Sequence, residues 1–127
     1  MISFESFCLR DGVPIYLQII KHVKSGIVSG KIKNGEELPS RRVLSALLGL
    51  NPNTVQRAYR ILEEEGLIES HSGAKSLVSF DPSELPRLRE ELLALEARGV
   101  IESLGAMGIS REEAHALIDL YWGESNK

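Results

Sequence analysis

The sequence has little of what marks several specialised protein classes. Its 127 residues include one cysteine, Cys8, so neither an intrachain disulfide nor a cysteine-based zinc site is expected. No apolar run approaches the roughly 18 residues that cross a bilayer, and the first residues lack the basic and apolar segments of a secretory signal. We therefore expect a cytoplasmic protein that makes no use of a membrane.

The rest of the composition is ordinary for a globular protein of about one domain, but its charge is unevenly distributed. The net charge is -3. Residues 1–80 carry ten Lys and Arg against eight Asp and Glu, a balance of +2, whereas residues 81–127 carry five against ten, a balance of -5. This difference indicates two segments with different roles, and we predict one domain over residues 1–80 and a second over residues 81–127.

Three helices are predicted in the first segment. The first begins at Pro14 and ends at Gly30, because apolar residues recur at intervals of three and four between them. A short extended connection over residues 31–39 follows. The second helix is capped by Ser40 and ends at Gly49, and the third begins at Asn51 and Pro52 and runs to Gly66.

The second and third helices are joined by a short turn that contains a glycine, which is the helix-turn-helix arrangement. In this arrangement the later helix enters the major groove of DNA. One face of the third helix is apolar, and the other face carries Asn53, Gln56, Arg57 and Arg60. Amides match adenine edges, and guanidinium groups match guanine edges or phosphates, so this face suits DNA.

Two other interpretations of that polar face stay open. It could be the solvated side of a structural helical bundle. It could also belong to a winged-helix protein-interaction module, although such a module would be expected to expose an apolar face on the third helix. A hairpin predicted directly after the third helix favours DNA, because strands at residues 67–70 and 76–80 flank a loop at residues 71–75 and would form a wing.

The second segment is predicted to be a helical hairpin. A long helix starts near Leu85 and is ended near Met107 by Gly105 and Gly108, and Ser110 with Glu113 forms a capping box that opens a final helix. Two helices alone bury too little to be stable, so a second copy of the hairpin should cover their apolar faces and make a homodimer. The residues predicted to form that dimer interface are Leu85, Leu88, Leu92, Leu95, Ile101, Leu104, Leu117, Ile118 and Tyr121.

Motifs spread over residues 14 to 80 resemble the GntR family of bacterial transcription regulators. They include Pro14-Ile15-Tyr16, Leu38-Pro39-Ser40-Arg41-Arg42, the run from Asn51 to Tyr59, and Glu65-Gly66-Leu67-Ile68. The tail over residues 81–127 is too short for the large effector domains of other branches, which points to the YtrA-like subfamily. The resemblance implies an α+β, mostly α fold: a winged helix-turn-helix domain followed by a two-helix dimerisation hairpin.

The resemblance also implies a function and a set of contacts. It implies a dimeric repressor of a nearby operon, such as a transporter operon, that binds double-stranded DNA at a pseudo-palindromic operator. By this resemblance Arg42, Asn53, Thr54 and Gln56 contact DNA. The wing differs from the family's pattern, since Lys75 stands one place later than the usual basic residue. The predicted DNA-binding set is Ser40, Arg41, Arg42, Asn53, Thr54, Gln56, Arg57, Arg60, His71, Gly73 and Lys75.

Other chemistry is not expected. Glu112, His115 and Asp119 fall on one face of the last helix, but a metal site needs three or four ligands held together, so we expect no metal. No signature positions a nucleophile beside a base, and we expect neither enzymatic activity nor a cofactor. Tyr121 and Trp122 are predicted to pack against the leucines of the preceding helix. The alternative is that they edge a cavity for an unknown apolar small-molecule effector.

Overall fold

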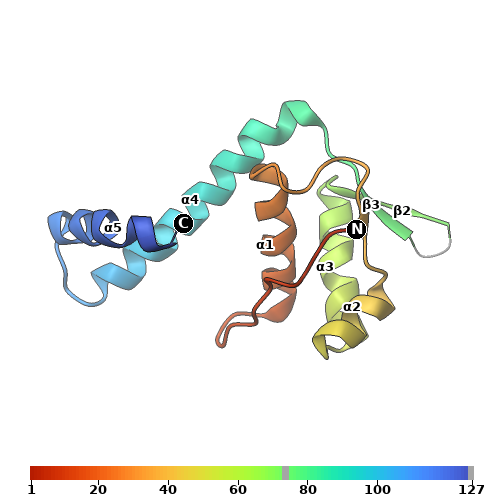
Figure 1. Cartoon of the computed structure of the whole chain (residues 1–127), viewed down its shortest axis with the longest axis horizontal. Coiled ribbons are helices and arrows are strands. Elements are labelled where there is room, and N and C mark those ends of the chain that lie inside the picture. Colours follow the sequence, from red (N-terminus) through yellow and green to blue (C-terminus); the bar gives the residue numbers. More distant parts are fainter. Residues whose placement is uncertain (73–74, 126–127) are drawn as a thin grey trace. The chain divides into compact units, whose positions relative to one another are not determined.

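The computed structural model describes residues 1–72 and 75–125 and divides the chain into two compact units (Figure 1). The winged unit comprises Met1–Arg89 and the tail unit Glu90–Lys127. The winged unit contains α1 (Ile15–Val28), α2 (Arg41–Leu48) and α3 (Pro52–Glu64), with three short strands. These helices agree with the three predicted from periodicity, although Pro14 caps α1 instead of lying within it.

The core of the winged unit lies where α1, α2 and α3 meet, and α1 and α3 run side by side (Figure 1). α1 contributes a stripe of four buried residues, Ile19, Ile20, Val23 and Ile27. α3 contributes Val55, Ala58, Tyr59 and Leu62, all fully buried. The apolar periodicity of each helix is therefore satisfied inside the unit.

The wing belongs to a three-stranded antiparallel sheet. The strands β1 (Glu37–Leu38), β2 (Ile68–His71) and β3 (Lys75–Val78) lie in the order β1-β3-β2. The sequence predicted the β2–β3 hairpin but not β1, because two residues show no alternation that could reveal a strand. β1 pairs through Glu37 with Leu77 of β3, which holds the wing against the segment that leads into α2.

The N-terminal segment completes this core, which the sequence did not predict. Ile2 and Phe4 are each 5% exposed, and the backbone N–H of Ile2 donates to the Glu37 carbonyl at 2.9 Å. The ring of Phe4 lies 4.5 Å from that of His22, whose Nε2 is 2.9 Å from the Ser3 carbonyl oxygen. His22 thus fastens the N-terminal segment onto α1.

Two helices follow the sheet. A short 3-10 turn (Pro82–Glu84) leads into α4 (Leu85–Gly105), and α5 (Arg111–Ser125) comes last. Asp81 accepts a hydrogen bond from the Ser83 backbone N–H at 2.9 Å, and this bond holds the pKa of the Asp81 carboxyl below its ordinary value. Leu85 and Leu88, at the start of α4, are half-buried against the core of the winged unit. Within the described residues, no helix is long and apolar enough to cross a membrane.

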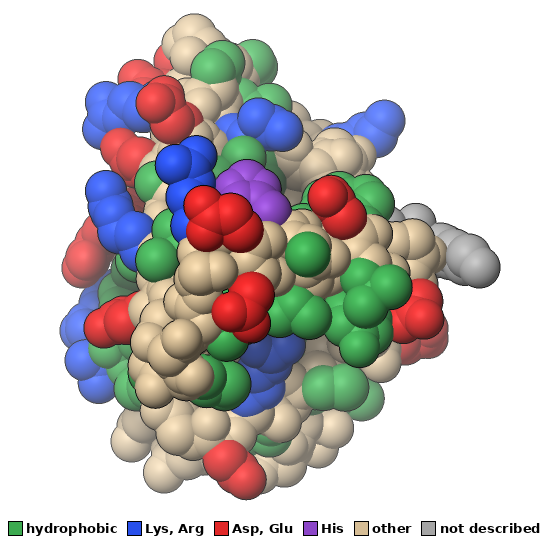
Figure 2. Space-filling model, turned by 90° about the vertical axis from the view of Figure 1, so that its left-hand side faces the viewer, with side chains coloured by type: hydrophobic (Ala, Val, Ile, Leu, Met, Phe, Trp, Pro, Cys, Tyr) green, Lys and Arg blue, Asp and Glu red, His purple; other side chains and the backbone are tan. Residues whose placement is uncertain are grey.

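The tail unit buries very little by itself. From Glu90 to Glu124 no described side chain is classed as buried. Figure 2 views the molecule from the α5 end of Figure 1, and exposed hydrophobic side chains lie there among charged ones. Tyr121 and Trp122, which the sequence predicted to pack against the leucines of the preceding helix, are 52% and 64% exposed within this chain.

Candidate nucleic-acid interface

Helix caps define both ends of α2 and the start of α3, and so fix the turn between the two helices. The Ser40 hydroxyl accepts from the Val43 backbone N–H at 3.1 Å and caps the start of α2. Gly49 ends α2 in the left-handed conformation, with φ of 66°, which a side chain would disfavour. Asn51 then accepts from the Asn53 N–H at 2.8 Å and caps α3. The three residues between the helices therefore form a defined helix-turn-helix corner.

A buried tyrosine fixes α3 against the segment before α2. The Tyr59 hydroxyl donates to the Pro39 carbonyl at 2.7 Å. Burial raises the pKa of Tyr59 well above its ordinary value, and the nearby positive charge of Arg41 offsets part of that rise. Tyr59 consequently stays neutral and keeps this hydrogen bond, so the orientation of α3 relative to the start of α2 is held by a buried contact.

The outward face of this corner carries polar side chains from both helices. Arg42, Asn53 and Gln56 are exposed, and Thr54 is half-buried. Among the described residues, no ion pair or side-chain hydrogen bond holds the Arg42 or Gln56 side chain. Their donors and acceptors are therefore available to an outside partner.

The other predicted arginines are engaged within the chain. The Arg41 guanidinium carbon lies 5.5 Å from the centre of the Tyr59 ring, and its Nε is buried without a hydrogen-bond partner among the described residues. The Arg57 guanidinium carbon lies 3.9 Å from the centre of the Tyr16 ring on α1. Arg60 pairs loosely with Glu64, 3.8 Å apart on the exposed surface of α3. The four predicted arginines are thus not equivalent. Within the described part of the chain Arg42 makes no contact of this kind, whereas Arg41, Arg57 and Arg60 are each engaged within the chain.

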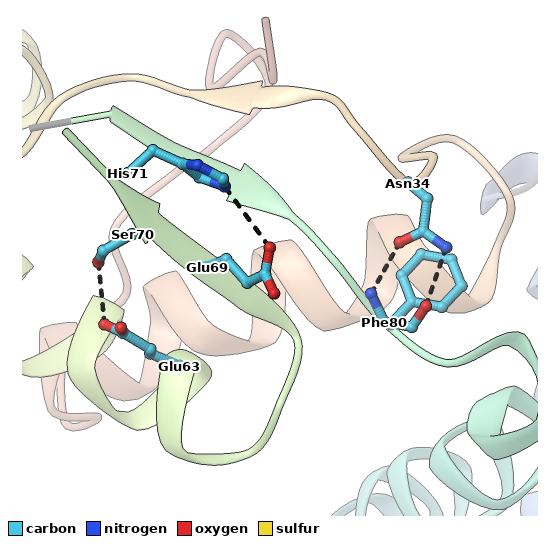
Figure 3. Close-up of polar contacts among 6 residues, drawn as sticks. All are labelled: Asn34, Glu63, Glu69, Ser70, His71 and Phe80. Atoms are coloured by element: carbon cyan, nitrogen blue, oxygen red, sulfur yellow. Dashed lines mark hydrogen bonds and ion pairs between the residues drawn. The ribbon is translucent and has the colours of Figure 1, made fainter. Parts of the chain in front are cut away.

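Both basic residues described on the wing, His71 and Lys75, lie near a carboxylate. His71 Nε2 is 3.5 Å from Glu69 on the same strand, and Lys75 Nζ is 3.9 Å from Glu37 on β1. Figure 3 shows His71 directed toward Glu69, and Ser70 donating to Glu63 of α3 at 3.1 Å. Gly73 lies outside the described residues. The wing therefore presents less net positive charge than its basic residues suggest.

An asparagine anchors the end of the wing. The Asn34 side chain donates to the Phe80 carbonyl at 2.9 Å and accepts from the Phe80 N–H at 2.7 Å (Figure 3). The sequence marked Asn34 only as part of a turn. Its role, like that of Tyr16 beneath Arg57, depends on contacts across 40 or more positions of the chain, which no local pattern reveals.

The tail unit contains a groove between α4 and α5. It has a volume of about 690 Å³ and is lined chiefly by apolar side chains, among them Leu93, Val100, Leu104 and Ile118. Among the described residues, no three His, Cys, Asp or Glu side chains are grouped so as to hold a metal ion.

A helix-turn-helix corner followed by a two-stranded wing defines the winged helix-turn-helix class of DNA-binding domain. Within that class, residues 15–78 match the family described as "Bacterial regulatory proteins, gntR family", and the chain belongs to this family. Its members are DNA-binding regulators of transcription and not enzymes. The family and the fold class predicted from the sequence are therefore confirmed.

Known relatives agree with this assignment. The chain is 44% identical over 70 residues to the HTH-type transcriptional repressor YtrA of Bacillus subtilis, a match covering 55% of this chain and 54% of that repressor. The chain thus aligns with about half the length of that relative. A GntR family transcriptional regulator from Listeria monocytogenes has a similar structure, with a TM-score of 0.70, 31% identity, and coverage of 87% of this chain and 97% of that one.

The YtrA structure from Sulfolobus acidocaldarius, a GntR-family transcription factor, is also similar. Its TM-score is 0.57 at 32% identity, and the match covers 77% of this chain and 98% of that one. The chain is accordingly a YtrA-like member of the family.

Proposed function

We propose that this protein is a homodimeric repressor that binds an inverted-repeat operator through α2 and α3. The observation that carries the proposal is the unengaged polar surface at the helix-turn-helix corner, formed by Arg42, Asn53 and Gln56. Their amide and guanidinium groups match the donor and acceptor pattern that base edges present in a major groove.

In this function α3 enters the major groove with its N-terminal turns foremost. Asn53 and Gln56 lie on those turns, where their amides form two hydrogen bonds to an adenine edge. Arg42 lies in the first turn of α2 and contacts a guanine or a phosphate. The remaining predicted residues contact the DNA phosphate backbone and position the protein on the duplex: Ser40, Arg41, Thr54, Arg60, His71 and Lys75. The contacts described above restrain Arg41 and the two wing residues.

The tail unit supplies dimerisation in this proposal. Leu95 and Ile101 on α4 are 67% and 69% exposed, and Leu117, Ile118 and Tyr121 on α5 are exposed too. A second copy would cover them, because soluble monomers rarely leave so many large apolar side chains in water. Leu85 and Leu88 contribute less to this interface than the sequence suggested, since both pack against the winged unit.

A two-fold dimer places two copies of α3 on one DNA duplex. Half-sites roughly 34 Å apart, one turn of the double helix, suit such a pair, and the operator is then an inverted repeat. Occupancy of an operator that overlaps a promoter blocks transcription, which makes the protein a repressor acting in the bacterial cytoplasm.

The alternative function, a protein-interaction module, would require an apolar surface on α3. The exposed residues Asn53, Gln56, Arg57 and Arg60 are all polar, which favours DNA.

The test is a binding titration with the inverted repeat upstream of the protein's own operon. We expect Arg42→Ala and Gln56→Ala each to weaken binding by about 1–3 kcal/mol, the value of a good base contact, while the thermal melt stays unchanged. Arg89→Ala is the matched control, because it removes an exposed arginine far along the chain from the corner. Unchanged affinity in both test variants would refute the assignment of the DNA-binding surface.

A further inference from the structure

A close contact between a cation and an aromatic ring joins α1 to α3. The Arg57 guanidinium carbon lies 3.9 Å from the centre of the Tyr16 ring, well inside the roughly 6 Å over which a ring attracts a cation. Tyr16 is half-buried on the edge of the core, whereas Arg57 is exposed on the polar face of α3. The ring is therefore fixed by packing, and the arginine lies over it on the side that faces outward.

We propose that Tyr16 is a positioning residue that holds Arg57 ready to contact DNA. This inference rests on the proposed function, and it adds to that function a residue outside the helix-turn-helix corner. The guanidinium lies over the ring, and among the described residues no hydrogen bond or ion pair occupies its N–H groups, which remain free to donate. An arginine held over a ring can thus still form two parallel hydrogen bonds to a phosphate or to a guanine edge.

Arg57 differs from Arg41 and Arg60 because its positive charge and its N–H groups remain available to an outside partner. Arg60 has a carboxylate nearby, Glu64 at 3.8 Å, which partly neutralises it. Arg41 is half-buried, and its Nε is shielded from solvent. For Arg57, by contrast, no carboxylate within the described residues lies within ion-pair distance, and its side chain is exposed. Its positive charge is therefore ordered by the ring without being cancelled.

Ordering of this kind strengthens binding because a free arginine loses many rotamers when it contacts DNA. Because the ring already restricts Arg57, part of this side-chain entropy is lost when the protein folds, and less is lost when it binds DNA. The position along α3 is also suitable, since Arg57 lies one turn after Asn53 on the same face. The contact that it makes would therefore lie beside the bases that Asn53 and Gln56 address.

The test is a double-mutant cycle on operator affinity with Tyr16→Leu, Arg57→Ala and the two combined. We expect Arg57→Ala to weaken binding roughly tenfold and Tyr16→Leu roughly threefold, in line with one phosphate or base contact and one exposed cation–ring contact. In the Arg57→Ala background Tyr16→Leu should have no further effect. Tyr16→Phe keeps the ring and should bind as the wild type does.

Each alternative outcome overturns the inference in a distinct way. If Tyr16→Phe loses as much affinity as Tyr16→Leu, the hydroxyl is what matters and the ring does not position Arg57. If the two effects simply multiply, the residues act independently. Should Tyr16→Leu unfold, Arg57→Lys replaces it: binding equal to the wild type would show that a point charge suffices. Failure of the proposed function is separate, because it appears as no operator binding by the wild-type protein.

Discussion

The winged unit and the tail unit use similar apolar residues in opposite ways. In the winged unit sixteen hydrophobic side chains are buried in one cluster, which includes Ile19, Leu44 and Leu62 at 0% exposure. In the tail unit no described side chain up to Glu124 is buried, although α4 and α5 carry leucine, isoleucine, tyrosine and tryptophan.

This difference separates two kinds of stability. The winged unit has helices on several sides and a sheet, so each apolar stripe finds a partner within the chain. Two helices have only each other, and most of their apolar surface stays in water. The winged unit is thus complete by itself, whereas the tail unit needs another surface, which we propose to be its own copy.

The largest expected effect is a loss of stability that is independent of protein concentration in the winged unit but dependent on it in the tail unit. Ile19→Ala should destabilise the protein by about 2–5 kcal/mol at every concentration, because it opens a cavity in the core of the winged unit. Ile101→Ala should act only through the dimer, so its effect should grow as the protein becomes more concentrated. Thermal melts at two concentrations, one below and one above the dissociation constant of the dimer, measure both.

A loss of stability in Ile101→Ala that is the same at both concentrations would break the comparison. It would mean that Ile101 contributes to the stability of the single chain and not to the dimer.

The next prediction concerns assembly. Ile101→Arg places a charge in the proposed interface and should weaken dimerisation at least a hundredfold, on the order of 3 kcal/mol. A fragment ending at Arg89, which keeps Leu85 and Leu88 on their core, should be a folded monomer. Sedimentation equilibrium measures both masses.

Glu102→Arg is the matched control for this experiment, since it adds an arginine one position along α4 at an exposed charged site. It should remain a dimer. If the fragment ending at Arg89 were itself a dimer at micromolar concentration, the interface would lie in the winged unit.

The helices were predictable from sequence because their signals are local. Ser40, Asn51 and Pro52 act within a few residues of themselves, and each starts the helix that the sequence predicted. β1 was not predictable, because two residues carry no pattern and the strand exists only through pairing with Leu77. The burial of Ile2 likewise depends on Glu37, which is distant in the chain.

The candidate site shows the same limit. Residue type alone places Arg41, Arg42 and Arg57 in one class, a class suited to DNA. The structure separates them: Arg42 is unengaged, Arg41 lies half-buried over Tyr59, and Arg57 lies over Tyr16. Such differences come from neighbours in space, which are set by the packing of α1 against α3 and not by spacing along one helix.

Two helical glycines, Gly26 in the winged unit and Gly99 in the tail unit, give a smaller difference in stability between the two units. A Cβ at Gly26 in α1 would approach Ile32 Cγ1 to 2.6 Å, so Gly26→Ala should destabilise by about 1–3 kcal/mol through overpacking. A Cβ at Gly99 in α4 would meet no atom within 4 Å, and Gly99→Ala should stabilise by about 0.5–1 kcal/mol through helix propensity. Urea denaturation measures both, and destabilisation by Gly99→Ala would indicate that a second chain packs closely there.

The smallest expected effect is on the salt dependence of operator binding, which depends on positive charge on the wing but not on α4. Lys75→Ala on the wing should reduce the salt dependence of operator binding by about one unit of slope or less per protomer, because Glu37 already offsets part of that charge. Glu37→Gln should act in the opposite direction and strengthen binding slightly. Arg98→Ala removes an exposed charge from α4 and should leave the slope unchanged. Titrations across a series of salt concentrations measure the three slopes. Equal slopes for Lys75→Ala and the wild type would show that the wing does not approach the phosphates, and DNA contact would then be confined to α2 and α3.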